Sequence, residues 1–207
     1  MLRTCFICCL LLISFGLRAQ KKLQRVIFAQ GISLVQLNSA NCFKVEVHTS
    51  QGNEVAIEAE IEGEYTQDLD LKVNTNGTAI LIEAGFVPSF ENPNDKLSAH
   101  KVISILLKLT IPKNKDLEIY GTNSRVVIDG TYKGVKVALS DGVCQLNEVV
   151  GNVNVRTQSG SIDVMTKSAK IEANSKYGKV SPNQIPKGLS VYNLQTVTGN
   201  IELNKTE

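Results

Sequence analysis

The sequence predicts an all-β protein in which a β-solenoid of about 18-residue coils covers residues 114–207 and an antiparallel β region over residues 20–113 caps it. Two observations predict this fold. Apolar and polar residues alternate with a period of two along most of the chain, which is typical of strands with one buried face. From residue 117 onward the sequence also repeats in blocks of 18 residues, and such repeats indicate stacked units. We expect the two regions to form one continuous domain.

The composition limits the class of function. Of the 207 residues, 43% are apolar, which is enough for a core, and 22 basic residues nearly balance 20 acidic ones. This balance excludes a disordered acidic chain and a basic nucleic-acid binder. Aromatic residues make up 5% and tryptophan is absent. The chain therefore has few side chains on which nucleic-acid bases could stack or that could line an aromatic carbohydrate-binding cleft.

Residues 1–19 have the three parts of a secretory signal peptide: Arg3, an apolar run over residues 5–17, and a short segment that ends at Ala19. The run is too short to span a bilayer, which takes roughly 20 residues. A lipoprotein anchor is the alternative, but no cysteine directly follows the run. We therefore expect export to the periplasm or the outer cell surface, with no membrane span in the mature chain.

Removal of the signal peptide leaves Cys42 and Cys144 in an oxidising compartment, where they could form a disulfide. Cys144 falls at a position that the alternation predicts to face the core, and a lone buried cysteine behaves as a small apolar residue. The sequence therefore favours two buried thiols over a disulfide.

Six segments in the N-terminal half alternate in this way, and turn residues separate them. They are residues 32–34, 43–47, 55–61, 69–73, 80–82 and 103–111. Asn76-Gly77 is the strongest turn signal, so residues 69–73 and 79–83 should pair as an antiparallel hairpin. The stretch 85–100 contains two prolines and is the longest predicted loop, and loops of that length are often functional.

The repeating half consists of four blocks and a partial fifth. The blocks begin at Leu117, Val135, Val153 and Ile171, and the fifth aligns Ile201 with Ile162. Each block carries two short alternating strands. Its eighth column reads Ser124, Gly142, Gly160 and Gly178, and glycine suits a corner that needs a positive φ. Because one block has too narrow an apolar face to bury alone, we expect each strand to pair with its equivalent in the next block.

The outward columns of the blocks test this stacking. One reads Glu118, Lys136, Asn154 and Glu172, and the other reads Val127, Gln145, Asp163 and Ser181. With neighbouring strands about 4.8 Å apart, neither column places two carboxylates in adjacent coils. Ordinary antiparallel hairpins of accidentally equal length, in a sandwich or a barrel, remain the alternative.

Two of the coils, residues 157–164 (TQSGSIDV) and 196–203 (TVTGNIEL), together with residues 95–101 (DKLSAHK), carry a resemblance to a known family. Behind an export signal and an alternating N-terminal half, they resemble the bacterial putative-adhesin family of exported domains of unknown function. The resemblance covers most of residues 30–204. It implies a right-handed β-solenoid or β-roll on or near the cell surface, and it transfers no catalytic or binding residue.

Few residues carry a signal for catalysis or metal binding. His48 and His100 have no second ligand at metal-binding spacing and are interpreted as surface residues. Ser98 and Lys101 reproduce an S-x-x-K tetrad, but its companion motifs are absent from the sequence. A tetrad of this kind readily arises by chance.

Other short motifs are equally weak. The pairs Asp129-Gly130 and Asp141-Gly142 lack the glycine pair of calcium-binding nonapeptide repeats and are interpreted as turns. Asn76 and Asn204 fit the N-glycosylation acceptor pattern, but we expect neither to be glycosylated in a bacterial protein. We therefore predict no catalytic, cofactor-binding or metal-ligating residue, and no cofactor.

These observations favour an exported, non-enzymatic adhesin-like or structural module. Polar residues would line one turn edge of the coils and bind a glycan or a surface protein by hydrogen bonds. They are Thr122, Asn123, Ser140, Asp141, Gln158 and Ser159. Solvated turn residues are the alternative interpretation, so no site is assigned to them.

Two further possibilities stay open. A polysaccharide lyase or hydrolase would need carboxylates gathered in adjacent coils, or a site between the two halves of the chain. Self-association would use residues 200–203 as an edge strand that Lys205 only partly protects.

Overall fold

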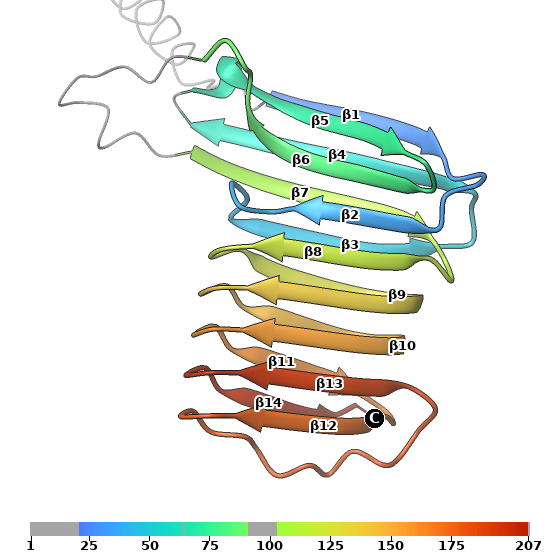
Figure 1. Ribbon diagram of the computed structural model, residues 1–207, viewed down its shortest axis with the longest axis vertical. Helices are drawn as coiled ribbons and strands as arrows, with labels where there is room; N and C mark the ends of the chain where they lie inside the picture. The colour runs from blue at the N-terminus through green and yellow to red at the C-terminus, as the bar shows by residue number, and fades with distance from the viewer. Residues whose placement is uncertain (1–20, 64, 91–102, 207) are drawn as a thin grey trace, which may run out of the picture.

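The computed structural model describes residues 21–63, 65–90 and 103–206, so the predicted signal peptide at residues 1–19 lies outside the described part. Within these ranges the chain forms strands and one short 3-10 helix, η2 (Thr66–Asp68), and no α-helix (Figure 1). The strands are β1 (Lys21–Phe28), β2 (Leu34–Asn38), β3 (Lys44–Ser50), β4 (Glu54–Gly63), β5 (Leu69–Asn76), β6 (Ala79–Phe86), β7 (Ile103–Pro112), β8 (Asp116–Gly121), β9 (Arg125–Leu139), β10 (Cys144–Thr157), β11 (Ile162–Thr166), β12 (Lys170–Ser175), β13 (Val191–Thr196) and β14 (Ile201–Lys205). The all-β prediction is confirmed, and no helix in the described ranges has the length and apolarity that a membrane crossing requires.

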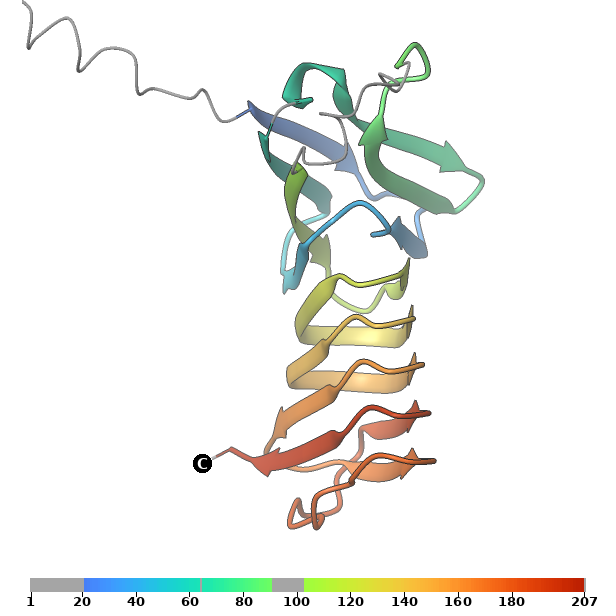
Figure 2. The same ribbon diagram turned by 90° about the vertical axis from the view of Figure 1, so that its left-hand side faces the viewer.

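All of these strands belong to one mixed sheet that curls on itself (Figures 1 and 2). What we call the first wall runs in the order β1-β4-β7-β3-β9-β10-β11-β14, and the second wall runs β5-β6-β2-β8-β9-β10-β13-β12. The long strands β9 and β10 belong to both walls. They bend from one to the other near Gly130 (φ 108°) and Gly151 (φ 135°), where the ladder between them shifts register.

The hydrophobic core lies between the two walls. Alternate residues of each strand point inward, and strand pairing arranges them in rows. One inner row of the second wall contains Leu37, Ile119, Val137, Val155 and Leu194, each at most 1% exposed. Each wall is one strand layer thick, so its apolar face is shielded from water only by the opposite wall.

The predicted right-handed β-solenoid or β-roll with an antiparallel cap is wrong. The sheet is a nearly closed, barrel-like mixed sheet in which parallel pairs already occur in the N-terminal region, between β2 and β6 and between β3 and β7. The parallel pairs β2–β8 and β3–β9 then continue the sheet across the predicted boundary at residue 113. The N-terminal region is therefore built into both walls.

The strand order at the C-terminal end also departs from the prediction. The 18-residue period does set the register of β8, β9 and β10, where Leu117 pairs with Val135 and Val135 with Val153. Next to β10, however, lies β13, and β12 pairs only with β13. Ala173 is consequently separated from Val155 by Leu194.

The side chains explain this insertion. From β13, Tyr192 and Leu194 are fully buried, and the Tyr192 hydroxyl donates to the Val149 carbonyl. The equivalent residues of β12, Ile171 and Ala173, are smaller and remain half-buried. Placing the larger pair beside β10 buries more apolar surface, which favours the observed order.

In the N-terminal region the predicted hairpin is confirmed. β5 and β6 pair antiparallel with Val73 opposite Ile82, and Gly77 in the turn has a φ of 57°. The sequence missed β1, because its residues do not alternate cleanly, with three consecutive exposed residues at its centre. Of the long predicted loop at 85–100, the first residues extend β6 to Phe86, and residues 91–100 lie outside the described part.

The glycines of the eighth column have a different role from the predicted one. None of Gly142, Gly160 and Gly178 has a positive φ. Each instead lets an adjacent backbone approach closely: a Cβ on Gly160 would meet the Gly142 carbonyl oxygen. A Cβ on Gly178 would meet the carbonyl oxygen of Gly199, which matches the inserted strand order. These glycines allow neighbouring turns to stack.

Replacing Gly160 with alanine should therefore destabilise the protein by about 1–3 kcal/mol, because the new methyl group overlaps a backbone that cannot move freely. Gly52→Ala is the matched control, since its Cβ would meet only the Ser50 hydroxyl at 3.5 Å, and it should change stability by less than about 0.5 kcal/mol. Urea denaturation of both variants measures the difference, and an equal effect would contradict the stacking role.

Candidate functional site

The predicted turn edge exists as a physical ridge. The Thr122 carbonyl accepts hydrogen bonds from the Asp141 and Gly142 N–H groups at 2.8 and 2.9 Å. The Ser140 carbonyl in turn accepts from the Ser159 N–H at 2.9 Å. The structure thus brings together all six predicted residues in successive tiers. Most are exposed, and the Ser159 hydroxyl donates to the Asp141 carboxylate.

The turn that follows β13 extends this ridge beyond the predicted residues. The Gln158 carbonyl accepts from the Thr198 N–H at 2.9 Å, and the Val197 carbonyl accepts from the Tyr177 N–H at 2.8 Å. Tyr177 is 70% exposed, and the Lys176 ammonium lies 4.9 Å from its ring centroid. The far end of the turn edge therefore carries an exposed aromatic ring.

The outer face of the second wall is rich in side-chain amides. Strand registers arrange its residues in two rows across the wall. One row is Lys72, Glu83, Asn38, Tyr120, Ala138, Arg156, Gln195 and Asn174, and the other is Asn74, Leu81, Gln36, Glu118, Lys136, Asn154, Asn193 and Glu172. Successive members of a row are about 4.8 Å apart, so the face presents donors and acceptors at regular spacing.

A groove of about 570 Å³ hollows the upper part of this face, between the β5–β6 hairpin and the strands β2 and β8. Its polar lining is Gln36, Asn38, Lys72, Asn74, Glu83, Tyr120 and Thr122. Thr122 belongs also to the turn edge, so groove and edge are continuous. A groove of this size with several amides and one aromatic ring can hold a polyhydroxylated ligand.

Neighbouring groups fix Tyr120 in place. Its hydroxyl donates to the Glu118 carboxylate at 2.7 Å, and the Lys136 ammonium lies 5.3 Å from its ring centroid. Hydrogen bonding with Tyr120, followed by the charge of Glu118, raises the pKa of Lys136. Lys136 is therefore protonated at neutral pH, and the groove has a preorganised aromatic side chain.

The outer face of the first wall differs over β1, β4, β7 and β3, because ion pairs join its charged side chains there. The Glu60 carboxylate contacts Lys108 at 3.1 Å and Lys22 at 3.3 Å, and Lys44 contacts Glu46 at 2.6 Å. Hydrogen bonds from Lys108 and then Lys22 lower the pKa of Glu60. This arrangement is typical of a solvated charged face.

His48 lies on this face, as the sequence predicts for a surface residue, and its ring nitrogen contacts Asp129 on the neighbouring strand. The described residues contain no cluster of three or more histidine, cysteine or acidic side chains that could hold a metal ion. Asp129 and Gly130 lie within strand β9, at its bend, so their interpretation as turn residues is wrong: Gly130 allows the strand to bend through its positive φ. His100, Ser98 and Lys101 lie outside the described residues.

The same wall contains a carboxylate pair that the sequence analysis missed. The predicted neighbour of Asp163 was Ser181, but the register of β11 and β14 places Glu202 beside it. Burial, and then the charge of Glu202, raises the pKa of Asp163, while Arg125 opposes the shift. The alignment of Ile201 with Ile162 contained this information, because the next residues in each segment are Glu202 and Asp163.

The two cysteines offer no reactive nucleophile. Both thiols are buried and unpaired, which confirms the preference for thiols over a disulfide. Burial raises the pKa of the Cys42 thiol to about 12, and it also raises the pKa of the Cys144 thiol. Neither side chain supplies a thiolate at neutral pH.

Comparisons with known proteins support the fold. No protein-family profile and no curated protein matches the chain. A putative cell adhesion protein from Clostridium sporogenes is 16% identical, with a TM-score of 0.63 over 91% of this chain and 100% of the other. A putative adhesin from Bacteroides fragilis is 12% identical over 91% and 98% of the two chains, with a TM-score of 0.39. The first protein shares the fold of this chain, and at 16% identity the similarity shows nothing beyond the fold. The second similarity is too low to show a shared fold.

The carboxylate pair generates a stability prediction. A raised pKa in the folded state means that ionised Asp163 costs stability, so Asp163→Asn should stabilise the protein at pH 7 by about 0.5 kcal/mol. The gain should vanish below roughly pH 3, where carboxylic acids are protonated.

A double-mutant cycle with Glu202→Gln measures the coupling by urea denaturation. Once Glu202 is neutral, Asp163→Asn should bring little further gain. Glu172→Gln, whose cross-strand neighbour is Asn193, is the control and should have little effect. Purely additive effects of the two substitutions would show that the carboxylates do not interact.

The buried thiols generate a second prediction. A thiol reagent such as Ellman's reagent should label neither Cys42 nor Cys144 at pH 8 in native buffer, and should label both in 6 M guanidinium, because unfolding exposes them. Rapid labelling of the native protein would show that the core opens at these positions.

Proposed function

We propose that the protein is an exported, non-enzymatic adhesin-like module that binds a glycan through the groove and the amide-rich face of its second wall. Its place of action is the periplasm or the outer cell surface. One observation carries the proposal: amide, hydroxyl and aromatic side chains are gathered in a groove that continues into an open polar face. The name of the structurally similar Clostridium sporogenes protein, a putative cell adhesion protein, agrees with it.

The physical chemistry of the face suits an extended neutral polymer. Amide side chains both donate and accept hydrogen bonds, as sugar hydroxyls require. Because these amides stand on a rigid sheet, binding costs little ordering of the protein. Neither Gln36 nor Asn74 has a side-chain hydrogen-bond partner within the described residues, so both are available to a ligand.

A second candidate function is a polysaccharide lyase or hydrolase, and the Asp163–Glu202 pair favours it. Carboxyl groups about 5 Å apart are the arrangement that retaining glycosidases use, and an acid with a raised pKa is needed for proton donation. The pair lies on the open outer face of the first wall, however, and the groove is on the second. Binding without turnover is therefore the function that the geometry supports best.

The two functions are separated by assaying the mature chain, residues 20–207, on a glycan array and then for release of reducing or unsaturated sugar ends. We expect stable binding and no release. Turnover that Asp163→Asn and Glu202→Gln each abolish would overturn the proposal in favour of the enzyme.

Removing two groove amides should weaken binding of the best neutral array ligand. Gln36→Ala combined with Asn74→Ala should raise the dissociation constant about tenfold in calorimetry, because each hydrogen bond contributes about 0.5–1.5 kcal/mol. The control removes two exposed amides of the first wall, Gln24 and Asn204. An equal loss of affinity in both double variants would exclude the groove as the binding site.

A further inference from the structure

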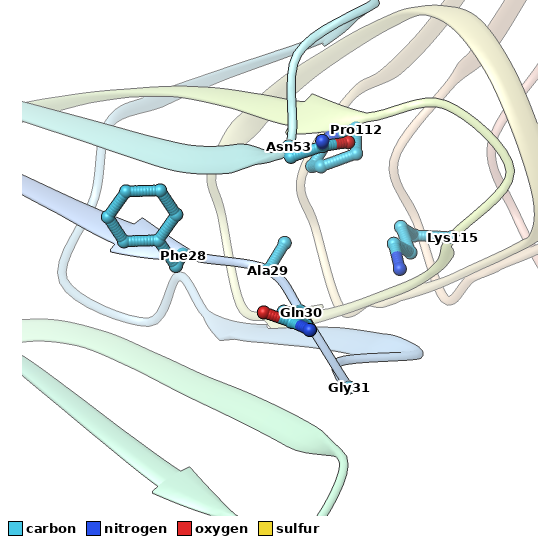
Figure 3. Close-up of a pocket in the computed structure, with 7 residues that line it drawn as sticks. All are labelled: Phe28, Ala29, Gln30, Gly31, Asn53, Pro112 and Lys115. Atoms are coloured by element: carbon cyan, nitrogen blue, oxygen red, sulfur yellow. The ribbon is translucent and has the colours of Figure 1, made fainter.

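A second cavity lies at the opposite ends of β2 and β8 from the groove, with a volume of about 540 Å³. Its lining is Phe28, Ala29, Gln30, Gly31, Asn53, Pro112 and Lys115 (Figure 3). These residues come from the end of β1 and the connection to β2, from the end of β7, and from the turns before β4 and before β8. In Figure 3 the Phe28 ring and the Lys115 side chain stand at opposite sides, with Ala29 and Gln30 between them.

Lys115 brings a positive charge into this cavity. Its side chain is half-buried, and its ammonium donates one hydrogen bond to the Ile32 carbonyl at 2.5 Å. In the part of the chain that the structure describes, no carboxylate forms an ion pair with it, whereas the next lysine along the same edge, Lys133, contacts Asp116 at 3.4 Å. A partly desolvated ammonium with two remaining N–H donors favours an anionic ligand, and a carboxylate most directly.

The other side of the cavity provides an apolar surface and two amides. Phe28 is 74% exposed, although it is a large apolar residue. The side-chain amides of Gln30 and Asn53 have no hydrogen-bond partner among the described residues. The backbone carbonyl of Asn53 accepts a hydrogen bond from the Ala29 N–H at 2.8 Å. A ligand that fits must therefore combine a carboxylate, an apolar ring face and hydroxyl groups.

We propose that this cavity binds an acidic sugar, a uronate residue of a polysaccharide, in addition to the neutral glycan contacts of the groove. The assignment rests on the proposed glycan-binding function. The carboxylate pairs with Lys115, the C–H face of the sugar ring packs on Phe28, and the sugar hydroxyls bond to Gln30 and Asn53. A purely apolar carboxylic acid would bury both amides without partners, which costs free energy.

The test compares a tetramer of galacturonate with its carboxyl-reduced, neutral form by isothermal titration calorimetry at low salt. The acidic tetramer should bind at least tenfold more tightly. Lys115→Met should abolish the preference, Lys115→Arg should retain it, and Phe28→Ala should weaken binding of both tetramers. Lys133→Met is the matched control, because it removes the same charge from the same edge without touching the cavity, and it should leave the preference intact.

Carbodiimide coupling provides a readout that needs no variant. Activated galacturonate should form an amide with the Lys115 amine in the wild-type protein, and mass spectrometry of the digested protein should locate it there. Coupling at other lysines only would overturn the proposal. So would tighter binding of 3-phenylpropionate or of a peptide carboxyl terminus than of the uronate, since that would identify a different kind of carboxylate.

The outcomes also separate this inference from the proposed function. If the groove double variant loses neutral glycan binding while the uronate still couples to Lys115, both sites stand. If the wild-type protein binds neutral glycans but shows no preference for the acidic tetramer, the cavity assignment fails and the groove remains. If uronate couples at Lys115 and no neutral glycan binds, the cavity stands and the groove proposal fails.

Discussion

The structure depends on one constraint: neither wall can shield its own apolar face, so the two walls must cover each other along the full length of the molecule. The bent strands β9 and β10 join the two walls covalently, since one half of each strand lies in the first wall and the other half in the second. Their in-register parallel pairing aligns inner residues in apolar rows, and the same registers align outer residues in polar rows. The candidate binding surface is thus a direct product of the pairing that makes the core.

The two outer faces differ in how their polar side chains are paired. On the first wall, charged residues neutralise each other across strands, as Glu60 does with Lys108 and Lys22. On the second wall, many positions carry amides, and Gln36 and Asn74 among them have no side-chain hydrogen-bond partner within the described residues. Unpaired amides on a rigid sheet retain their capacity for hydrogen bonding, whereas paired charges have used theirs.

Local patterns in the sequence predicted the local parts of this fold. The Asn76-Gly77 turn and the alternation around it were sufficient for the β5–β6 hairpin, and the 18-residue period was sufficient for the register of β8, β9 and β10. The pairing of β2 with β8 joins segments about 80 residues apart and leaves no local signal. The position of β13 depends on how much surface Tyr192 and Leu194 bury compared with Ile171 and Ala173, which only the assembled interior decides. For the same reason the sequence predicted the turn edge but missed the groove, whose residues come from four strands and share no motif.

The inserted position of β13 has a consequence for the order of events during synthesis. β12 leaves the ribosome before β13, and until residue 196 has emerged the strand that belongs beside β10 does not exist. The end of the sheet therefore cannot grow by adding each new strand to the last one. Its completion waits for the C-terminal segment, because β13 provides the strand beside β10 and β12 pairs only with β13. A fold whose repeats suggest simple vectorial growth thus finishes with a late, non-local step of the kind that slows folding.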